Sequence, residues 1–571
     1  MSESVLLRVD HLGIAFRRGK TTSTAVYDST FEVHRGKTLA IVGESGSGKS
    51  VSSLSLMHLL HRENTVFTSG RFMLDGSILQ TPPPPNGFLP TDPALATLRG
   101  KKIAMIFQEP MTSLNPVLTC GFQVEEVLIK HLSYSREKAR LKTLELFNEV
   151  KLPRAEQMLD QYPHQLSGGQ RQRVMIAMAI ACEPLLLIAD EPTTALDVTV
   201  QKEILQLLRQ LQHNRGMGMI FITHDLGVVE EIADDILVMQ QGKVVEYGGA
   251  RHILANPQHE YTRGLLQCRP NPKQKNARLL TVRDFENNPS PALKQKNASA
   301  ISDVLFLKTE GLTKVYQTPS LFRKNRPPVI GVDNVSFHIR KGETLGLVGE
   351  SGCGKTTLSR MLLGLIPAST GSIEYSFEDR RAVDITKLSS HDLRLLRKEI
   401  QIVFQDPYSA LNPKHTIGAA LTEPMYVHSI GASDNQRRAF ATELLEKVGL
   451  SAEHFNRYPH EFSGGQRQRI VIARALACKP SFIICDESVS ALDVSVQAQV
   501  LNLLNDLKYE FGLTYLFISH DLRVVHYMSD RIMVMNKGRV EEIGDANDVF
   551  DHPSSDYTKR LLNAIPGGHM S

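Results

Sequence analysis

Two glycine-rich stretches dominate the chemistry that this 571-residue chain can perform. Residues 43–50 and 349–356 both fit the pattern G-x-x-x-x-G-K-[ST], each after an apolar run and before a segment that can open a helix. Glycines there let backbone N–H groups approach phosphate oxygens, while the lysine reaches the β- and γ-phosphates. The pattern predicts two phosphate-binding loops, made by Gly43, Glu44, Ser45, Gly46, Ser47, Gly48, Lys49 and Ser50 and by Gly349, Glu350, Ser351, Gly352, Cys353, Gly354, Lys355 and Thr356.

A pair of carboxylates follows a buried apolar run in each half of the chain, at Asp190-Glu191 and Asp486-Glu487. The first acid can hold Mg²⁺, and the second can orient or deprotonate an attacking water. The alternative to a catalytic pair is an acidic turn that merely follows a strand. That alternative poorly explains why the acidic pair occurs twice, each time at an equivalent place after a phosphate loop. We therefore expect Glu191 and Glu487 to be catalytic, and we expect the metal ligands to be Ser50, Asp190, Thr356 and Asp486 together with two glutamines.

These glutamines, Gln108 and Gln405, end predicted strands, where an amide could contact both the metal and the attacking water. His224 and His520 end further strands and could contact the γ-phosphate. A lone glutamine is usually a surface residue, and a lone histidine is usually structural. Repetition of the histidines at the offset of the acidic pairs favours a functional role for them. We expect both histidines to be catalytic and both glutamines to bind nucleotide and metal.

A second glycine-rich motif, Ser-Gly-Gly-Gln, opens a helix at Ser167 and again at Ser463. The N-terminal end of a helix with a free hydroxyl is an anion site. Simple helix capping explains the serine but not the two glycines that follow it. Two anion sites in each half suggest that nucleotide is shared between the halves, with contacts from Ser167, Gly168, Gly169, Gln170, Ser463, Gly464, Gly465 and Gln466.

The second half of the chain repeats the first. Position 405 follows position 108 by 297 residues, and an offset of 296 relates the signature serines, the acidic pairs and the histidines. Lys355 follows Lys49 by 306 residues. The first half therefore has nine or ten extra residues between its phosphate loop and Gln108, and a proline run at 81–87 in this stretch predicts a surface insertion. This is a tandem duplication of one domain and not a solenoid.

The length of the chain is too great for one core and suits two or more domains. Residues 269–303 are rich in Pro, Asn, Lys and Gln without periodicity, which predicts a linker. The boundaries expected are therefore 1–268 for domain 1, 269–303 for the linker and 304–571 for domain 2. Strands alternating with helices predict an α/β fold with parallel sheets and ligand sites at the C-terminal ends of the strands.

Composition excludes several classes of protein. A net charge of +4, from 65 Lys and Arg against 61 Asp and Glu, does not favour a nucleic-acid binder. The six cysteines form no C-x-x-C pair, so they predict reduced thiols without a zinc or redox site. Residues 1–10 lack the apolar core of a signal peptide, and the most apolar window, 176–189, is broken by Glu183-Pro184. We expect that the chain does not cross a membrane.

Six motifs occur in the same order in both halves: the phosphate loop, the glutamine, Leu-Ser-Gly-Gly-Gln (Phe-Ser-Gly-Gly-Gln in the second half), Asp-Glu, Ala-Leu-Asp and the histidine. This ordered set resembles the nucleotide-binding domains of ABC transporters. The resemblance implies two tandem P-loop NTPase domains. Each would have a mostly parallel core sheet, an antiparallel β part and a helical subdomain, and the two would close head-to-tail over two ATP molecules. It also implies that Phe16 and Tyr316 stack on adenine and that Asp197 and Asp493 communicate between the halves.

Finer features resemble the oligopeptide, dipeptide and nickel importer ATPases. They include the stretches 108–116 and 405–413, the Tyr-Pro-His before each signature and the Tyr-Thr near the end of each half. The single chain is similar to the fused ATPases of peptide, glutathione and microcin-type importers. This implies an ATP-hydrolysing subunit, peripheral on the cytoplasmic face of the inner membrane. It would bind two integral-membrane permease subunits and depend indirectly on an extracytoplasmic solute-binding protein.

Three expectations complete the interpretation. Some relatives carry a cysteine cluster for an iron–sulfur centre, but only Cys268 lies in that region, so we expect no cluster. The second half has Phe462 for the signature leucine, a tolerable apolar exchange, and Ser488-Val489-Ser490 for Pro192-Thr193-Thr194, but Glu487 is present, so we expect the second site to be catalytic as well. The apolar residues after the two glutamines are expected to dock permeases or, alternatively, to be core; they are Met111, Leu114, Tyr408 and Leu411.

Two other classes of tandem ATPase fit the sequence less well. A soluble ATPase that acts on ribosomes has similar motifs, but its linker is a long charged helical arm, whereas 269–303 is short and contains four prolines. A DNA-repair ATPase would insert coiled coils or zinc-binding cysteines, and the sequence contains neither. The solute and the direction of transport do not follow from these residues alone.

Overall fold

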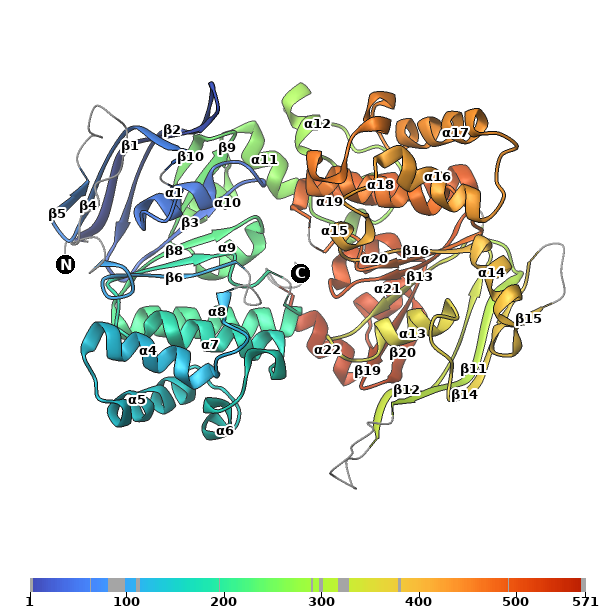
Figure 1. Ribbon diagram of the computed structural model, residues 1–571, viewed down its shortest axis with the longest axis horizontal. Coiled ribbons are helices and arrows are strands. Elements are labelled where there is room, and N and C mark those ends of the chain that lie inside the picture. Colours follow the sequence, from blue (N-terminus) through green and yellow to red (C-terminus); the bar gives the residue numbers. More distant parts are fainter. Residues whose placement is uncertain are drawn as a thin grey trace.

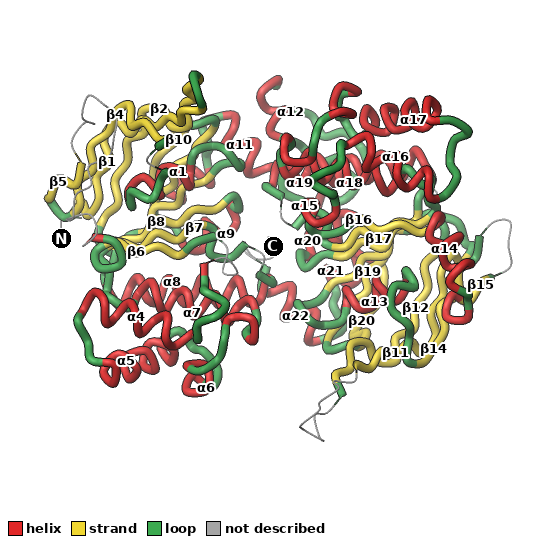
Figure 2. Tube along the Cα trace, viewed as in Figure 1, coloured by secondary structure: helices red, strands yellow, loops and turns green. Residues whose placement is uncertain are grey.

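The computed structural model describes residues 4–61, 63–80, 98–108, 113–194, 196–288, 291–296, 301–316, 328–377, 382–490 and 492–565. The expected insertion at 81–87 and Met111 lie outside these ranges. Figure 1 shows two halves side by side, the first from blue to green and the second from yellow to red. Their helical parts lie at opposite ends of the view, at the bottom in the first half and at the top in the second (Figure 2).

The first half is built on a sheet of ten described strands in the order β5-β4-β1-β2-β10-β9-β3-β8-β7-β6. Its parallel core strands are β9 (Asp235–Gln240), β3 (Thr38–Val42), β8 (Gly218–Thr223), β7 (Leu186–Asp190) and β6 (Ile103–Ile106). The antiparallel part contains β1 (Val5–Arg18), β2 (Thr21–His34), β4 (Thr65–Leu74), β5 (Ser77–Gln80) and β10 (Lys243–Gly249). Every residue of β3, β7 and β8 is buried, as expected for parallel strands covered on both faces.

The second half repeats this plan with two described sheets. A six-stranded sheet holds β16 (Ile400–Val403), β17 (Phe482–Asp486), β18 (Thr514–Ile518), β13 (Thr344–Val348), β19 (Arg531–Asn536) and β20 (Arg539–Asp545), in that order. A four-stranded antiparallel sheet holds β12 (Val329–Arg340), β11 (Leu305–Tyr316), β14 (Thr370–Tyr375) and β15 (Val383–Asp384). The predicted fold class is confirmed.

Helices cover the sheets and form a helical part in each half. The first half has α4 (Cys120–Leu132), α5 (Arg136–Glu149), α6 (Ala155–Leu159) and α7 (Gly168–Ile180). The second has α14 (Ser390–Glu399), α15 (Pro407–Ala410), α16 (Ile417–Val427), α17 (Asp434–Lys447) and α18 (Gly464–Leu476). Thr119 and Ser135 cap α4 and α5 by accepting backbone N–H groups, which is why these helices begin there. None of the described helices is long and apolar enough to cross a membrane.

The remaining helices occur as equivalent pairs around the core strands. They are α1 (Lys49–Leu56) and α13 (Lys355–Leu362), α8 (Val198–Arg215) and α19 (Val494–Phe511), α9 (Leu226–Ile232) and α20 (Leu522–Met528), α10 (Ala250–Ala255) and α21 (Ala546–Asp551), and α11 (Glu260–Gln267) and α22 (Asp556–Asn563). One further helix, α12 (Val282–Asn287), lies in the segment expected to be a linker.

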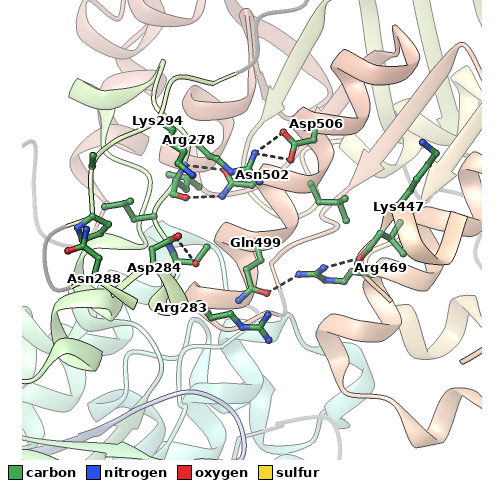
Figure 3. A pocket seen from close by; sticks show the side chains of 18 of the residues that line it. Arg278, Arg283, Asp284, Asn288, Lys294, Lys447, Arg469, Gln499, Asn502 and Asp506 are labelled. Carbon is green, nitrogen blue, oxygen red and sulfur yellow. Dashed lines mark hydrogen bonds and ion pairs between the residues drawn. The ribbon is translucent and has the colours of Figure 1, made fainter. Parts of the chain in front are cut away.

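This linker segment is docked on the second half (Figure 3). The Leu279 backbone N–H donates to Asn502 Oδ1 at 3.1 Å, and Asn502 Nδ2 donates to the Leu279 carbonyl at 2.9 Å. Arg278 donates to both carboxylate oxygens of Asp506 at 2.8 Å. Leu279 and Val282 also join a buried apolar cluster that includes residues of α19. Arg278 and Leu279 thus attach this segment to the second half, and the boundaries at 268 and 304 stay a prediction.

Strand β1 continues through Phe16 because its pairing with β2 and β4 extends that far. Of the two alternatives for the apolar residues after the glutamines, the core is the correct one for Leu114 and Leu411, which are buried at 1% and 3% exposure. Only Tyr408 of the described residues in that set is exposed, at 64%, with the Arg467 guanidinium 3.8 Å from its ring centroid.

Candidate nucleotide-binding sites

The first phosphate loop links β3 to α1 and needs glycine at defined positions. Gly48 caps α1 with φ of 101°, in the left-handed region that other residues avoid. Lys49 lies at the start of α1, where its Nζ donates to the carbonyls of Gly43 at 2.7 Å and Glu44 at 2.9 Å. Burial lowers the pKa of Lys49, and nearby carboxylates oppose this shift. The ammonium group is therefore held inside the loop.

A hydroxyl and a carboxylate meet beside this loop. Ser50 Oγ donates to Asp190 Oδ1 at 3.1 Å, although the residues are 140 positions apart. Burial raises the pKa of Asp190 to about 6, so a nearby cation would favour its ionised form. Oxygen donors of this kind suit a hard cation such as Mg²⁺, and the residues present therefore fit the metal expected from the sequence.

Glu191 lies at the centre of three strand-end groups. Gln108 Nε2 and Thr194 Oγ1 donate to its Oε2 at 3.0 and 2.9 Å, and His224 Nδ1 is 3.4 Å from its Oε1. Its φ of 45° is unusual for a residue other than glycine. Burial alone would raise the pKa of Glu191, but the contacts with His224, Lys49 and Thr194 bring it down to about 2. The carboxylate is thus ionised and fixed in direction.

The second half builds a similar site. Lys355 Nζ donates to the carbonyls of Gly349 at 2.6 Å and Glu350 at 3.0 Å, and it is 3.9 Å from Glu487 Oε1. Gln405 Nε2 donates to Glu487 Oε2 at 3.0 Å, and His520 Nδ1 is 3.5 Å from the same oxygen. The contacts with His520 and Lys355 outweigh the effect of burial and lower the pKa of Glu487.

The two halves contact each other through their phosphate loops. The Ser45 backbone N–H donates to Asp493 Oδ2 at 3.0 Å, and the Ser351 backbone N–H donates to Asp197 Oδ1 at 2.8 Å. Asp197 and Asp493 are the N-cap residues of α8 and α19. Each half thus presents an aspartate to the phosphate loop of the other, and the relation is reciprocal.

The same pairing of halves forms a cavity of about 490 Å³. The first half lines it with Glu44, Ser45, Gly46 and Ser47, and the second half with residues that include Ser463, Gly465 and Gln466. The structure therefore brings the first phosphate loop and the second signature motif together, as a shared nucleotide site requires.

Within the signature motifs, the local geometry divides the roles of the residues. Ser463 Oγ accepts the Gln466 N–H at 3.4 Å, and Gln466 Oε1 accepts the Ser463 N–H at 3.0 Å, so the serine is a helix cap. Ser167 and Gln170 form the same capping box in the first half. A Cβ on Gly465 would contact the side chain of Val496, so packing requires a glycine there, whereas a Cβ on Gly464 would meet open space.

The two aromatic residues expected to stack on adenine are placed differently. Tyr316 is 41% exposed, and its hydroxyl is 3.4 Å from Thr357 Oγ1, next to the second phosphate loop. Phe16 is half-buried and packs against the apolar core of the first half. Cys268 is buried at the end of α11, and burial raises the pKa of its thiol to about 12.

The sequence interpretation missed three side chains near the sites. Tyr261 and Tyr557 accept the backbone N–H of Glu44 at 2.9 Å and of Glu350 at 3.2 Å through their hydroxyls, and Thr194 bonds Glu191. The sequence places the tyrosines in a family-like tail and at an offset of 296 residues from each other, without giving them a role. That offset was the available signal, because the signature serines, the acidic pairs and the histidines share it.

Comparison with known proteins identifies the class. The family model for ABC transporters matches residues 26–194 and 332–490, and the chain belongs to this family. A model for the C-terminal region of oligopeptide/dipeptide transporters matches residues 245–294 and 541–569. The chain is accordingly an ABC-type ATPase that uses ATP, with two ATP-binding cassettes in tandem.

Individual relatives cover almost the full length. The glutathione import ATP-binding protein of Pectobacterium atrosepticum is 46% identical over 99% of this chain and 90% of the relative. That of Escherichia coli K12 is 47% identical over 98% of this chain and 89% of the relative. Among solved structures, a dimeric ATP-binding cassette with ADP and Pi matches at 29% identity and a TM-score of 0.38, covering 42% of this chain and 98% of that chain.

Proposed function

We propose that this chain is the ATP-hydrolysing subunit of an importer for glutathione, peptides or related small solutes. The match to the C-terminal region of oligopeptide/dipeptide transporters supports this proposal, and so do the glutathione import relatives along nearly the whole chain. These relatives favour a transport ATPase over the alternative that acts on ribosomes.

The observation that carries the mechanism is the reciprocal pair of hydrogen bonds from Ser45 to Asp493 and from Ser351 to Asp197. It supports two composite sites, each built from the phosphate loop of one half and the signature helix of the other. The N-terminal end of α18 would cover the outer face of the ATP bound at Lys49 and stabilise its negative charge, and α7 would do the same at Lys355.

In each site the glutamate would act on the attacking water. The ionised carboxylate of Glu191 or Glu487 accepts a proton from water or orients it, while His224 or His520 contacts the γ-phosphate. The groups that would hold Mg²⁺ are Ser50, Gln108 and Asp190 in one site and Thr356, Gln405 and Asp486 in the other. When bound, the ion would neutralise negative charge on the phosphates.

The partners would be two integral-membrane permease subunits, served by an extracytoplasmic solute-binding protein. The chain would lie on the cytoplasmic face of the inner membrane without entering it. Because the closed, ATP-bound form and the open form hold the permeases differently, ATP binding and hydrolysis shift the permeases between two states.

Uptake in the host tests this function. Loss of the chain should abolish uptake of labelled glutathione or peptides, and the parental chain should restore it. Lys49→Ala/Lys355→Ala should not restore it, because neither phosphate loop could then hold the β- and γ-phosphates. Co-purification with integral-membrane proteins is expected; co-purification with ribosomes and unchanged uptake of both solutes would contradict the proposal.

A further inference from the structure

An arginine occurs in each half at one of two positions, but the position that it occupies differs between the halves. Gly227 in the first half corresponds to Arg523 in the second, at the offset of 296 residues. Arg269 in the first half corresponds to Ile565 in the second, at the same offset. Each half therefore has one arginine at these two positions, but in the first half it lies in the segment after α11 and in the second half it lies on helix α20.

In the structure, the side chain of Arg269 occupies the space that a side chain at position 227 would fill. A Cβ added to Gly227 would stand 2.7 Å from Cζ of Arg269, so the guanidinium of Arg269 fills the place of a side chain at position 227. Arg269 forms an ion pair with Asp225. Both arginines line one cavity of about 120 Å³ between the halves, together with His224, Asp225, His520, Asp521 and Ile565.

The paired aspartates organise the turns that carry the two histidines. Asp225 directly follows His224, caps α9 and accepts the Gly227 N–H at 2.9 Å. Asp521 directly follows His520, caps α20 and accepts the Arg523 N–H at 2.8 Å. A guanidinium beside such an aspartate therefore acts on the same turn that directs the histidine towards its glutamate.

Charge balance links the two turns across the interface. Burial and, to a smaller extent, the nearby Arg523 lower the pKa of Arg269 to about 10, and Asp521 opposes this shift. Two guanidinium groups and two carboxylates are thus close enough to influence one another. The Arg269 and Asp225 side chains are only 22% and 27% exposed, so loss of Arg269 would leave the Asp225 carboxylate without its ion-pair partner beside a histidine turn.

We propose that Arg269 and Arg523 are equivalent positioning residues, which hold His224 and His520 in their hydrolytic orientation through Asp225 and Asp521. The inference rests on the proposed role of the two histidines. It assigns the segment after α11 a function in the hydrolysis step, because Arg269 belongs to that segment.

The sharpest test moves the arginine from position 269 to position 227 on α9, which matches the position of Arg523 on α20. The full-length chain would be compared with Arg269→Ala and with Gly227→Arg/Arg269→Ala, which gives the first half the arrangement of the second. Arg269→Ala should lower kcat for ATP about tenfold and leave KM for ATP nearly unchanged, because the histidine turn shifts without loss of nucleotide contacts. The double variant should recover most of kcat.

The second half provides the matched experiment. Arg523→Gly should lower kcat, and Arg523→Gly/Ile565→Arg should recover it by adopting the arrangement of the first half. Arg269→Lys keeps the positive charge but loses the paired N–H donors of the guanidinium. Its kcat should therefore lie between those of the parental chain and Arg269→Ala. Thermal unfolding of every variant distinguishes a folding defect from a defect in the hydrolysis step.

His224→Ala, assayed in parallel, separates this inference from the proposed function. Unchanged kcat in His224→Ala would count against the histidine role itself. An inactive His224→Ala with an unaffected Arg269→Ala would overturn the inference alone. Two folded double variants that remain as slow as their single variants would also overturn it, because position and charge would then have been restored without effect.

Discussion

The two nucleotide sites share their motifs but differ in how the catalytic carboxylate is held. Glu191 accepts a hydroxyl hydrogen bond from Thr194, and its side chain is 9% exposed. In the second site the hydroxyl of Ser490 instead donates to the backbone carbonyl of Glu487 at 2.6 Å, and the Glu487 side chain is 19% exposed. The first site therefore restrains its carboxylate more tightly than the second.

The surroundings of the metal-site aspartates differ as well. Each aspartate lies near the lysine of its own phosphate loop, but Asp190 accepts a hydrogen bond from Ser50, whereas Asp486 also has Arg360 nearby. Position 360 corresponds to Leu54 at the phosphate-loop offset of 306, so the second site has an extra positive charge. Burial nevertheless raises the pKa of both aspartates to about 6. Equivalent motifs can thus reach similar electrostatics through different neighbours.

The largest effect is expected when the glutamates are changed. Glu191→Gln and Glu487→Gln should each slow ATP turnover by about 10²-fold or more, because an amide cannot accept the proton from water. The two changes together should trap ATP in a closed chain. Steady-state ATPase and retained nucleotide measure both effects. If Glu487→Gln left ATPase and nucleotide occupancy unchanged, the second site would be inactive.

A bulky charge in a signature motif should damage the site of the opposite half. Ser463→Arg should weaken ATP binding at the Lys49 site by about tenfold or more, because the arginine blocks the shared cavity. Ser167→Arg is the matched variant and should act on the Lys355 site. Labelling of each phosphate loop with a photoreactive ATP analogue distinguishes them. Damage confined to the mutated half would contradict sharing between halves.

The docked linker predicts a difference in stability between two equivalent helix positions. Asn502→Ala should cost about 1–3 kcal/mol, because it leaves the Leu279 backbone groups without partners. Gln206, at the equivalent position of α8, is exposed, so Gln206→Ala should change stability by less than about 0.5 kcal/mol. Thermal unfolding measures both, and equal effects would show that the linker contact contributes nothing.

The smallest effect concerns the hydroxyl beside Glu191. Thr194→Ala removes one contact that lowers the pKa of Glu191, so that pKa should rise. A carboxylate with a lowered pKa supports activity above that pKa and loses it as pH falls, so the acid limb of the kcat/KM profile should move to higher pH. Ser490→Ala should leave the limb in place, because that hydroxyl bonds a carbonyl. A shift of equal size in both variants would contradict the difference between the sites.

Much of the fold could be predicted because the chain repeats itself. Short apolar runs that end in a polar residue predicted that Gln108, Asp190 and His224 lie at strand ends. The second half repeats each of these runs, so each prediction had two independent copies. Parallel strands then place these groups at one edge of the sheet. The contacts of Glu191 with Gln108 and His224 agree with that expectation.

The remainder depended on contacts that no local pattern encodes. Leu114 and Leu411 follow the glutamines, but their burial is decided by helices packed from elsewhere in the chain. The docking of Leu279 on Asn502 joins residues 223 positions apart. The replacement of Gly227 by Arg269 becomes visible in the sequence only when both halves are aligned and two positions are compared together.

The most direct test of the account is the structure of Glu191→Gln/Glu487→Gln with ATP and Mg²⁺. The account predicts that Ser463 and Lys49 contact the same ATP, within about 10 Å of each other, and that Ser167 and Lys355 contact the other. A closed, ATP-bound chain in which Ser167 and Lys49 of one half contact the same ATP would contradict it.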